Sequence, residues 1–172
     1  KLTGESSIGA DKTNELLTLI VGPWTYTTKL TSGTYPNYKQ VIPGGNGLCS
    51  LEISADDTEL LIKALPSLPS FGSCGDTVVL RMEPSAIRVY VRETATSGES
   101  AIRLENSQFT GKPMSIGVNR HFFRDALQAG FRLIELTDSI SPLLARLSKE
   151  DVHSVHVLMP MRTCDTEVRK PD

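Results

Sequence analysis

The order of the predicted elements repeats along the chain, and this repeat constrains the possible folds more than any other feature. Short segments that alternate apolar and polar side chains predict strands with one covered face, and two longer segments predict amphipathic helices. In chain order the expected elements are a strand at 48–53, a helix at 54–65, strands at 77–82, 86–92 and 100–107, a strand at 114–118, a helix at 120–129, and strands at 131–137, 142–148 and 152–158. Two halves of the order β-α-β-β-β predict one α+β module, in which the two helices pack together on antiparallel sheet.

Residues typical of helix ends support both helix predictions. Ser54 stands before Asp56 and Asp57, and a serine N-cap with carboxylates in the first turn suits the exposed amides of a helix N-terminus. Asn119 is a comparable N-cap for the second helix. Gly130 stands where a left-handed residue commonly ends a helix.

The strand expected at 86–92 has two different faces. One face carries Ile87, Val89 and Val91, and the other carries Arg88, Tyr90 and Arg92. This period of two predicts a strand with one face in the core and one face toward water.

The chain before residue 48 differs from the repeated module. Residues 1–15 are polar and rich in Gly and Ser, which indicates a frayed or cut edge. The segments 16–21 and 24–30 are β-prone and flank Gly22-Pro23, so they predict two strands and a turn. Residues 31–43 read as a linker.

Composition describes an ordinary globular chain and excludes some function classes. The 172 residues suffice for one domain of ordinary size. Eighteen basic residues against 20 acidic ones give a net charge of −2, so any DNA contact must come from a local patch. No apolar run has membrane-spanning length. The first residue is Lys1, which suggests an excised or processed piece of a longer protein.

Neither a metal, a cofactor nor catalysis is expected. Cys49, Cys74 and Cys164 are far apart and predict free thiols in a reducing cytoplasm. The three histidines, at 121, 153 and 156, have no cysteine at ligand spacing. The acidic pairs at 56–57 and 150–151 are explained by capping and solvation, and no histidine has a context that pairs it with Cys74.

The stretch from Val155 to Arg162 has an unusual end. It begins as an apolar strand and stops at Pro160, which cannot donate to a sheet ladder. Met159 and Met161 flank this proline, and flexible thioethers are typical of adaptable binding surfaces. Two readings stay open: a core strand that ends at a proline, or the wall of a peptide-binding groove.

Four stretches, in order, resemble one family. Residues 157–162, Val-Leu-Met-Pro-Met-Arg, resemble the C-terminal signature of the bacterial sliding clamp, the beta subunit of DNA polymerase III. Residues 35–43 resemble the link that opens its last domain. Residues 116–119 with the phenylalanines at 122 and 123 resemble the start of its last inner helix, and residues 136–142 resemble the turn after that helix. The resemblance covers about residues 16–162.

This resemblance implies the DNA-clamp fold and a domain division. Residues 1–34 would be the last hairpin of the middle domain, residues 35–162 the C-terminal domain, and residues 163–172 a polar tail. It further implies a non-catalytic processivity factor that displays a hydrophobic groove to polymerases and repair proteins, which dock short peptides there. The groove residues carried over by position are Pro36, Val41, Asn119, Phe122, Ile140, Pro142, Val157, Leu158, Met159, Pro160, Met161 and Arg162.

The other contacts implied are those of a ring around DNA. Arg120, Arg124 and Lys63 would face double-stranded DNA weakly and without sequence preference. Leu68, Ile102 and Leu104 would contribute to a head-to-tail homodimer ring. A clamp loader is a further implied partner, and the implied location is the cytoplasm, at the nucleoid.

Some positions depart from the family pattern and keep an alternative open. Thr163 stands where a final leucine is common, and Pro142 where a small hydroxyl residue is often found. The first helix is acidic overall, with Lys63 against three carboxylates. The alternative is a clamp-like module for protein–protein interaction that does not encircle DNA. A third reading is an unrelated α+β domain that shares only the Met-Pro-Met-Arg end, residues 159–162, with this family.

Overall fold

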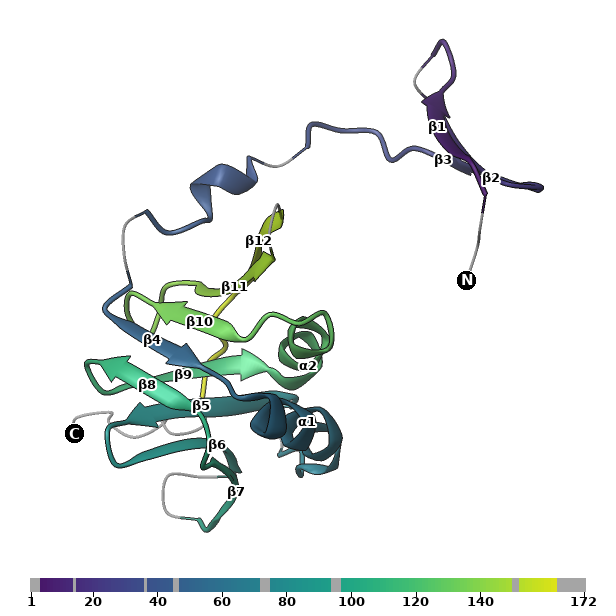
Figure 1. Ribbon diagram of the computed structural model, residues 1–172. Helices are drawn as coiled ribbons and strands as arrows, with labels where there is room; N and C mark the ends of the chain where they lie inside the picture. The colour runs from purple at the N-terminus through teal and green to yellow at the C-terminus, as the bar shows by residue number, and fades with distance from the viewer. Residues whose placement is uncertain are drawn as a thin grey trace. The chain divides into compact units, whose positions relative to one another are not determined.

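The computed structural model describes residues 4–13, 15–35, 37–44, 47–71, 75–93, 97–149 and 152–163. The chain divides into two compact units, Lys1–Asn37 and Tyr38–Asp172. Figure 1 shows the elements of both units.

The first unit is a three-stranded antiparallel sheet. Its strands β1 (Ser6–Ala10), β2 (Leu16–Val21) and β3 (Trp24–Lys29) follow the order β1-β2-β3. The two strands expected around Gly22-Pro23 are confirmed as β2 and β3. The apolar side chains of Trp24 and Tyr26 are 65% and 63% exposed in this sheet.

The expectation of a frayed edge over residues 1–15 is wrong, because β1 pairs with β2 along its whole length. The turn between them is organised by Asp11, whose Oδ1 accepts hydrogen bonds from the amides of Glu15 (2.8 Å) and Leu16 (3.0 Å). A hydrogen bond from the Thr13 hydroxyl helps to hold the pKa of the Asp11 carboxyl below its usual value. The polar composition hid this strand because its partners are backbone groups.

The second unit contains the repeated module. Its elements are the 3₁₀ helix η1 (Tyr38–Gln40), β4 (Cys49–Glu52), α1 (Ala55–Ala64), the 3₁₀ helix η2 (Leu65–Ser67), β5 (Thr77–Glu83), β6 (Ala86–Arg92), β7 (Glu99–Leu104), β8 (Gln108–Gly111), β9 (Met114–Asn119), α2 (Arg120–Gln128), β10 (Leu133–Leu136), β11 (Leu143–Lys149) and β12 (Val152–Leu158). The predicted α+β class and the order β-α-β-β-β in two halves are confirmed, with β8 as an additional strand.

The two halves exchange their first strands. The sheets have the orders β12-β11-β10-β4-β8 and β7-β6-β5-β9. Strand β4 of the first half therefore pairs with β10 of the second half, and β9 of the second half pairs with β5 of the first. Figure 1 shows α1 and α2 next to each other on one side of the unit. Each sheet needs a strand from the other half, so the halves form one structure.

Strand β8 was not expected because it is short and lies directly before β9. It pairs with β4, and Cys49 is opposite Gly111. Gly111 has a φ of +107°, and a Cβ there would lie 2.4 Å from the carbonyl oxygen of Leu48. A glycine therefore allows the chain to leave one sheet at β8 and enter the other at β9.

The helix caps form as predicted. Ser54 Oγ accepts from the amide of Asp57 (3.1 Å), and Asn119 Oδ1 accepts from the amides of His121 (2.9 Å) and Phe122 (3.3 Å). Gly130, with a φ of +94°, follows Ala129, the C-cap residue of α2. These contacts fix where both helices begin and where α2 ends.

One apolar core holds the second unit together. Leu51, Leu61, Leu80, Phe123 and Ile134 are among its fully buried side chains, and they come from both sheets and both helices. Burial raises the pKa of the Cys49 thiol, which lies in this core and is a poor nucleophile for that reason. Cys74 and Cys164 lie outside the described residues.

Candidate peptide-docking site

The segment after β12 lies along the outer edge of β9. The amide of Met161 donates to the carbonyl oxygen of Gly117 (2.8 Å), and the two residues form an antiparallel bridge. A Cβ on Gly117 would lie 2.5 Å from the carbonyl oxygen of Met161 and 2.6 Å from Cγ2 of Thr163. Only glycine permits this approach, so Gly117 holds the Met-Pro-Met segment in place.

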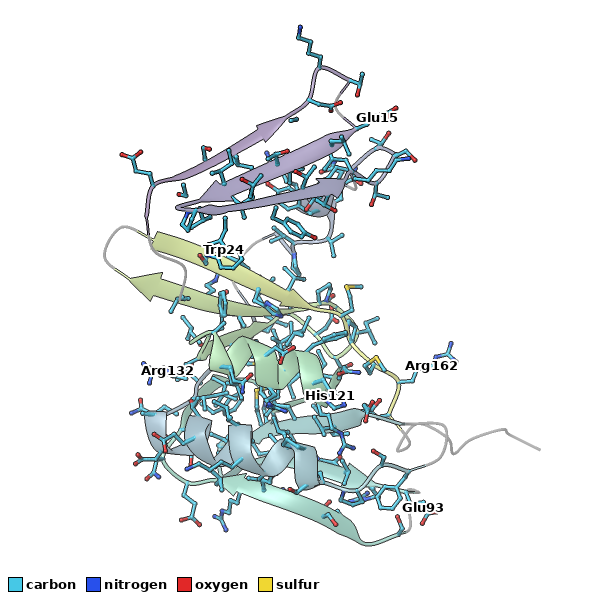
Figure 2. The ribbon with its side chains drawn as sticks, turned by 90° about the vertical axis from the view of Figure 1, so that its right-hand side faces the viewer. Glu15, Trp24, Glu93, His121, Arg132 and Arg162 are labelled. Atoms are coloured by element: carbon cyan, nitrogen blue, oxygen red, sulfur yellow. The ribbon has the colours of Figure 1, made fainter. Side chains whose placement is uncertain are left out.

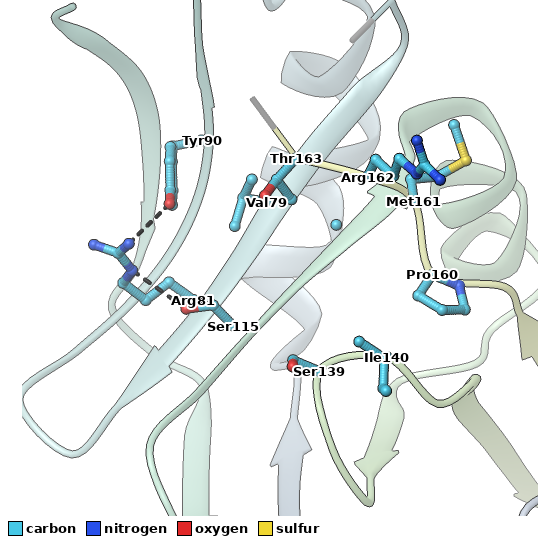
Figure 3. A pocket seen from close by; sticks show the side chains of 11 residues that line it. Val79, Arg81, Tyr90, Ser115, Ser139, Ile140, Pro160, Met161, Arg162 and Thr163 are labelled. Atoms are coloured by element: carbon cyan, nitrogen blue, oxygen red, sulfur yellow. Dashed lines mark hydrogen bonds between the residues drawn. The ribbon is translucent and has the colours of Figure 1, made fainter. Parts of the chain in front are cut away.

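A cavity of about 400 Å³ opens beside this segment. It is lined by Val79, Arg81, Tyr90, Ser115, Gly117, Ser139, Ile140, Pro160, Met161, Arg162 and Thr163. Figure 3 shows that the lining comes from the four-stranded sheet on one side and from the terminal segment and the β10–β11 turn on the other. Each wall therefore combines apolar side chains with an arginine, Arg81 on the sheet and Arg162 on the terminal segment.

The turn that presents Ile140 is held by the Asp138 carboxylate. Its Oδ1 accepts from the amides of Ile140 (2.8 Å) and Ser141 (2.5 Å), and its Oδ2 accepts from the Ser141 hydroxyl (2.7 Å). The hydroxyl bond and the two amide bonds hold the pKa of the Asp138 carboxyl below its usual value. The turn therefore keeps the Ile140 side chain in water, where it is 82% exposed.

Four of the predicted groove residues line the cavity together: Ile140, Pro160, Met161 and Arg162. Figure 2 shows Arg162 projecting away from the second unit. Met159 and Met161 are 60% and 40% exposed, which a buried core strand would not produce. The structure therefore favours the groove reading of this segment over the core reading.

Other predicted groove residues lie near this segment without lining the cavity. Leu143 is opposite Leu158 in the β11–β12 register, and continuing that register places Pro142 level with Met159. Asn119 lies two residues after Gly117, which forms the bridge with Met161.

The remaining groove predictions have different outcomes. Phe122 is 61% exposed on the first turn of α2, and Val41, after η1, is 43% exposed. Val157 is partly buried. The prediction for Leu158 is wrong, because this side chain is 4% exposed and belongs to the core. Pro36 lies outside the described residues.

The prediction that Arg120 faces DNA is also wrong. This side chain is 3% exposed, and its guanidinium donates to the carbonyl oxygens of Leu65, Leu68 and Pro69, the last at 2.7 Å. Its Nε lies 3.7 Å from Asp76 Oδ1. Arg120 therefore links the start of α2 to η2 and the residues after it. The sequence alone does not predict this role, because an arginine at the start of a helix is usually exposed.

The other two residues predicted to face DNA are accessible to different degrees. The Lys63 ammonium lies 3.5 Å from Glu59 Oε2 on α1, with both side chains exposed to more than 70%. Arg124 is partly buried, and the exposed Asp125 follows it. The Asp57 carboxylate accepts from the amide of Asn106 and the hydroxyl of Ser107, so it joins α1 to the chain after β7. Little unpaired positive charge remains on these helices.

The prediction that Ile102 and Leu104 contribute side chains to a ring interface is also wrong, because both are buried. Ile102 and Leu104 are 9% and 3% exposed, and both point into the core of this unit. Leu68 packs against the same core. Strand β7 is an edge strand of its sheet, so the backbone N–H and C=O groups on its outer side are available to pair with a strand of another molecule.

The residues that the structure describes offer neither of two other kinds of site. They contain no group of three or more His, Cys, Asp or Glu side chains that could hold a metal ion. No helix within them is long and apolar enough to cross a bilayer.

The exchanged β-α-β-β-β halves, with both helices on one side, define a DNA-clamp fold. Comparison with known proteins agrees. No family model matches the chain. The beta sliding clamp of Caulobacter vibrioides is 30% identical over 143 residues, which cover 79% of this chain and 36% of that protein.

Solved structures show the same relationship. The sliding clamp (DNA polymerase III subunit beta) of Bartonella birtlesii, bound to griselimycin, is 25% identical with a TM-score of 0.69, over 87% of this chain and 40% of that one. A Caulobacter crescentus beta sliding clamp, with a polyethylene glycol at a proposed beta-motif tethering region, is 25% identical with a TM-score of 0.71, over 94% and 42%.

The chain is therefore similar in sequence and in fold to bacterial beta sliding clamps, as its four motifs indicated. It spans about two-fifths of the length of these relatives.

Proposed function

We propose that this chain carries the peptide-docking site of a sliding clamp and serves a DNA polymerase processivity factor. The observation that carries the proposal is the exposed apolar group formed by Met159, Met161 and Ile140 beside a formed cavity. The Gly117–Met161 bridge and the Asp138 turn fix the backbone of this group before any ligand binds. Fixing the site in advance lowers the entropy that binding must offset.

The chemistry of this site favours a short peptide with apolar anchors. Each Å² of apolar surface removed from water contributes about 25 cal/mol, and the Ile140 side chain is 82% exposed without a ligand. The two methionines can repack around anchors of different shape. Such a site suits several partners that share a short motif, as polymerases, repair proteins and a clamp loader would.

The proposed role is that of an accessory subunit without catalysis of its own. A clamp that encircles DNA needs little affinity for it, because topology retains the ring. We propose that the full ring is a homodimer, that it holds double-stranded DNA without sequence preference, and that it works in the cytoplasm at the nucleoid.

A second candidate is a clamp-like interaction module that does not encircle DNA. The burial of Arg120 and the acidic α1 favour it, because they leave little positive charge on the helices. Retention of the protein on circular but not on linear plasmid DNA, in the presence of a clamp loader, would decide against this candidate.

The peptide proposal is tested by titrating the chain with a fluorescent peptide that begins with Gln and ends in Leu-Phe, and by measuring fluorescence anisotropy. We expect saturable binding and a loss of at least about tenfold in affinity for Met161→Lys, since a charge would enter an apolar contact.

Leu60→Lys is the matched control. Leu60 lies on α1 and is 43% exposed, close to the 40% of Met161, but it does not line the cavity. Equal binding by the wild-type chain and a folded Met161→Lys variant would remove Met161 from the site. Absence of binding by the wild-type chain would contradict the proposal itself.

A further inference from the structure

Three arginines stand in one row across the outer face of the four-stranded sheet. Arg81 on β5 is opposite Arg88 on β6, and Arg88 is opposite Arg103 on β7. Like charges directly opposite each other in an antiparallel pair are destabilising. The direct pairing of these arginines with one another therefore does not stabilise the sheet.

One carboxylate neutralises part of this face. Glu99 lies 2.7 Å from Arg88 and 2.6 Å from Arg92. Within the described part of the chain, neither Arg81 nor Arg103 forms an ion pair with a carboxylate. Glu83, two residues after Arg81 on β5, is a second carboxylate on this face, so the four arginines at 81, 88, 92 and 103 leave a smaller excess of positive charge. The Arg81 end of the row lines the cavity beside Met161.

Arg81 is held in a fixed position in that cavity. Its Nη2 donates to the hydroxyl oxygen of Tyr90 (2.9 Å), and its Nε donates to Ser115 Oγ (3.3 Å). Its guanidinium carbon lies 5.1 Å from the centre of the fully buried Tyr90 ring. Figure 3 shows both hydrogen bonds on the wall across from Pro160. A guanidinium has five N–H donors, so donors remain for a ligand.

A fixed guanidinium in a part-apolar cavity is suited to a carboxylate. Two parallel N–H donors match the two carboxylate oxygens, and desolvation strengthens the contact. The opposite wall has Ser139, Arg162 and Thr163 as polar members, but its apolar residues Ile140, Pro160 and Met161 suit the side chains of a peptide better than a sugar–phosphate backbone. The chemistry therefore favours an acidic peptide over a nucleic acid.

We propose that Arg81 receives the side chain of an aspartate or glutamate that flanks the apolar anchors of the docked peptide. This inference rests on the proposed peptide-docking function and names the partner more closely. The partner is an extended peptide in which apolar anchors contact Met161 and Ile140 and a neighbouring carboxylate reaches the Arg81 wall.

The test compares fluorescent peptides that differ only in charge. Each carries the same Leu-Phe anchors and either Asp or Asn at one flanking position, and a short series moves that position along both flanks. At one position, the wild-type chain should bind the Asp peptide about tenfold more tightly than the Asn peptide.

Two arginine variants identify the residue responsible. Arg81→Gln should bind the Asp and Asn peptides with equal affinity. Arg103→Gln is the matched control, because Arg103 lies in the same row and outside the cavity, and it should keep the preference for Asp. If Arg81→Gln unfolds, Arg81→Lys replaces it, since it keeps the charge and removes the paired donors.

The outcomes separate this inference from the function on which it rests. Binding of both peptides with equal affinity by the wild-type chain, or a preference for Asp that persists in Arg81→Gln, would overturn the role of Arg81 and leave the docking site intact. Absence of binding by any peptide would overturn both. If a single-stranded oligonucleotide displaces the peptide from the wild-type chain but not from Arg81→Gln, Arg81 binds a nucleic-acid phosphate, and the proposed carboxylate contact is wrong.

Discussion

At the residue scale, one glycine determines where the candidate site lies. Gly117 appears in the sequence as part of a family motif, but its role depends on the approach of Met161, which is 44 residues further along the chain. A local sequence pattern cannot predict this requirement for glycine, because it arises from contact between two segments that are far apart in the chain. The sequence singled out the methionines around Pro160, since a proline between two methionines at a strand end is unusual in a core, but the pattern alone left both a core strand and a groove wall open.

Replacing Gly117 with alanine should release the terminal segment from β9. The new Cβ would lie 2.5 Å from the carbonyl oxygen of Met161, so the backbone must move. We expect faster hydrogen exchange at the Met161 amide, weaker binding of the Leu-Phe peptide, and a loss of about 1–3 kcal/mol in the free energy of unfolding. Gly44→Ala is the control, since a Cβ there meets nothing within 4 Å. Unchanged exchange at Met161 would show that the bridge does not depend on glycine.

At the scale of the elements, periodicity predicted strands and helices well where one face of an element is buried. Strand β6 has the predicted bounds, and both N-caps form as expected. The polar β1 and the short β8 were missed, because backbone pairing alone identifies them. Charged residues on the helices were the weakest predictions, since the same Arg can face water or, like Arg120, satisfy buried carbonyl groups.

The role of Arg120 as a tie between α2 and η2 can be measured. Arg120→Gln leaves carbonyl groups after η2 without their donors, and each buried unsatisfied group costs about 1–3 kcal/mol. We expect the free energy of unfolding in urea to fall by about 3 kcal/mol, while DNA binding does not change. Lys63→Gln, at an exposed pair, should change stability by no more than about 0.5 kcal/mol. A stable Arg120→Gln variant with weaker DNA binding would restore the original prediction.

At the scale of the whole molecule, the exchange of first strands makes the second unit one cooperative structure. The sequence predicted the repeat of element order but could not show which strands pair, because both halves have the same pattern. Strand β4 needs β10 as its neighbour, and β9 needs β5, so neither half contains a complete sheet. The docking segment after β12 lies against β9, which belongs to the sheet of the other half. The candidate site therefore requires both halves.

A fragment of residues 38–112 should not fold by itself. In this fragment β4 lacks its neighbour β10, and β5 lacks its neighbour β9, which is the edge strand of the other sheet. The core also loses Phe123 and Ile134. We expect no cooperative transition in urea for this fragment, and recovery of the transition when residues 113–172 are added as a second chain. A fragment of residues 38–172 is the control, because it keeps every strand pair of the second unit and should unfold cooperatively. Cooperative unfolding of residues 38–112 alone would mean that the two halves are independent, and that the clamp fold tolerates the loss of the exchanged strands.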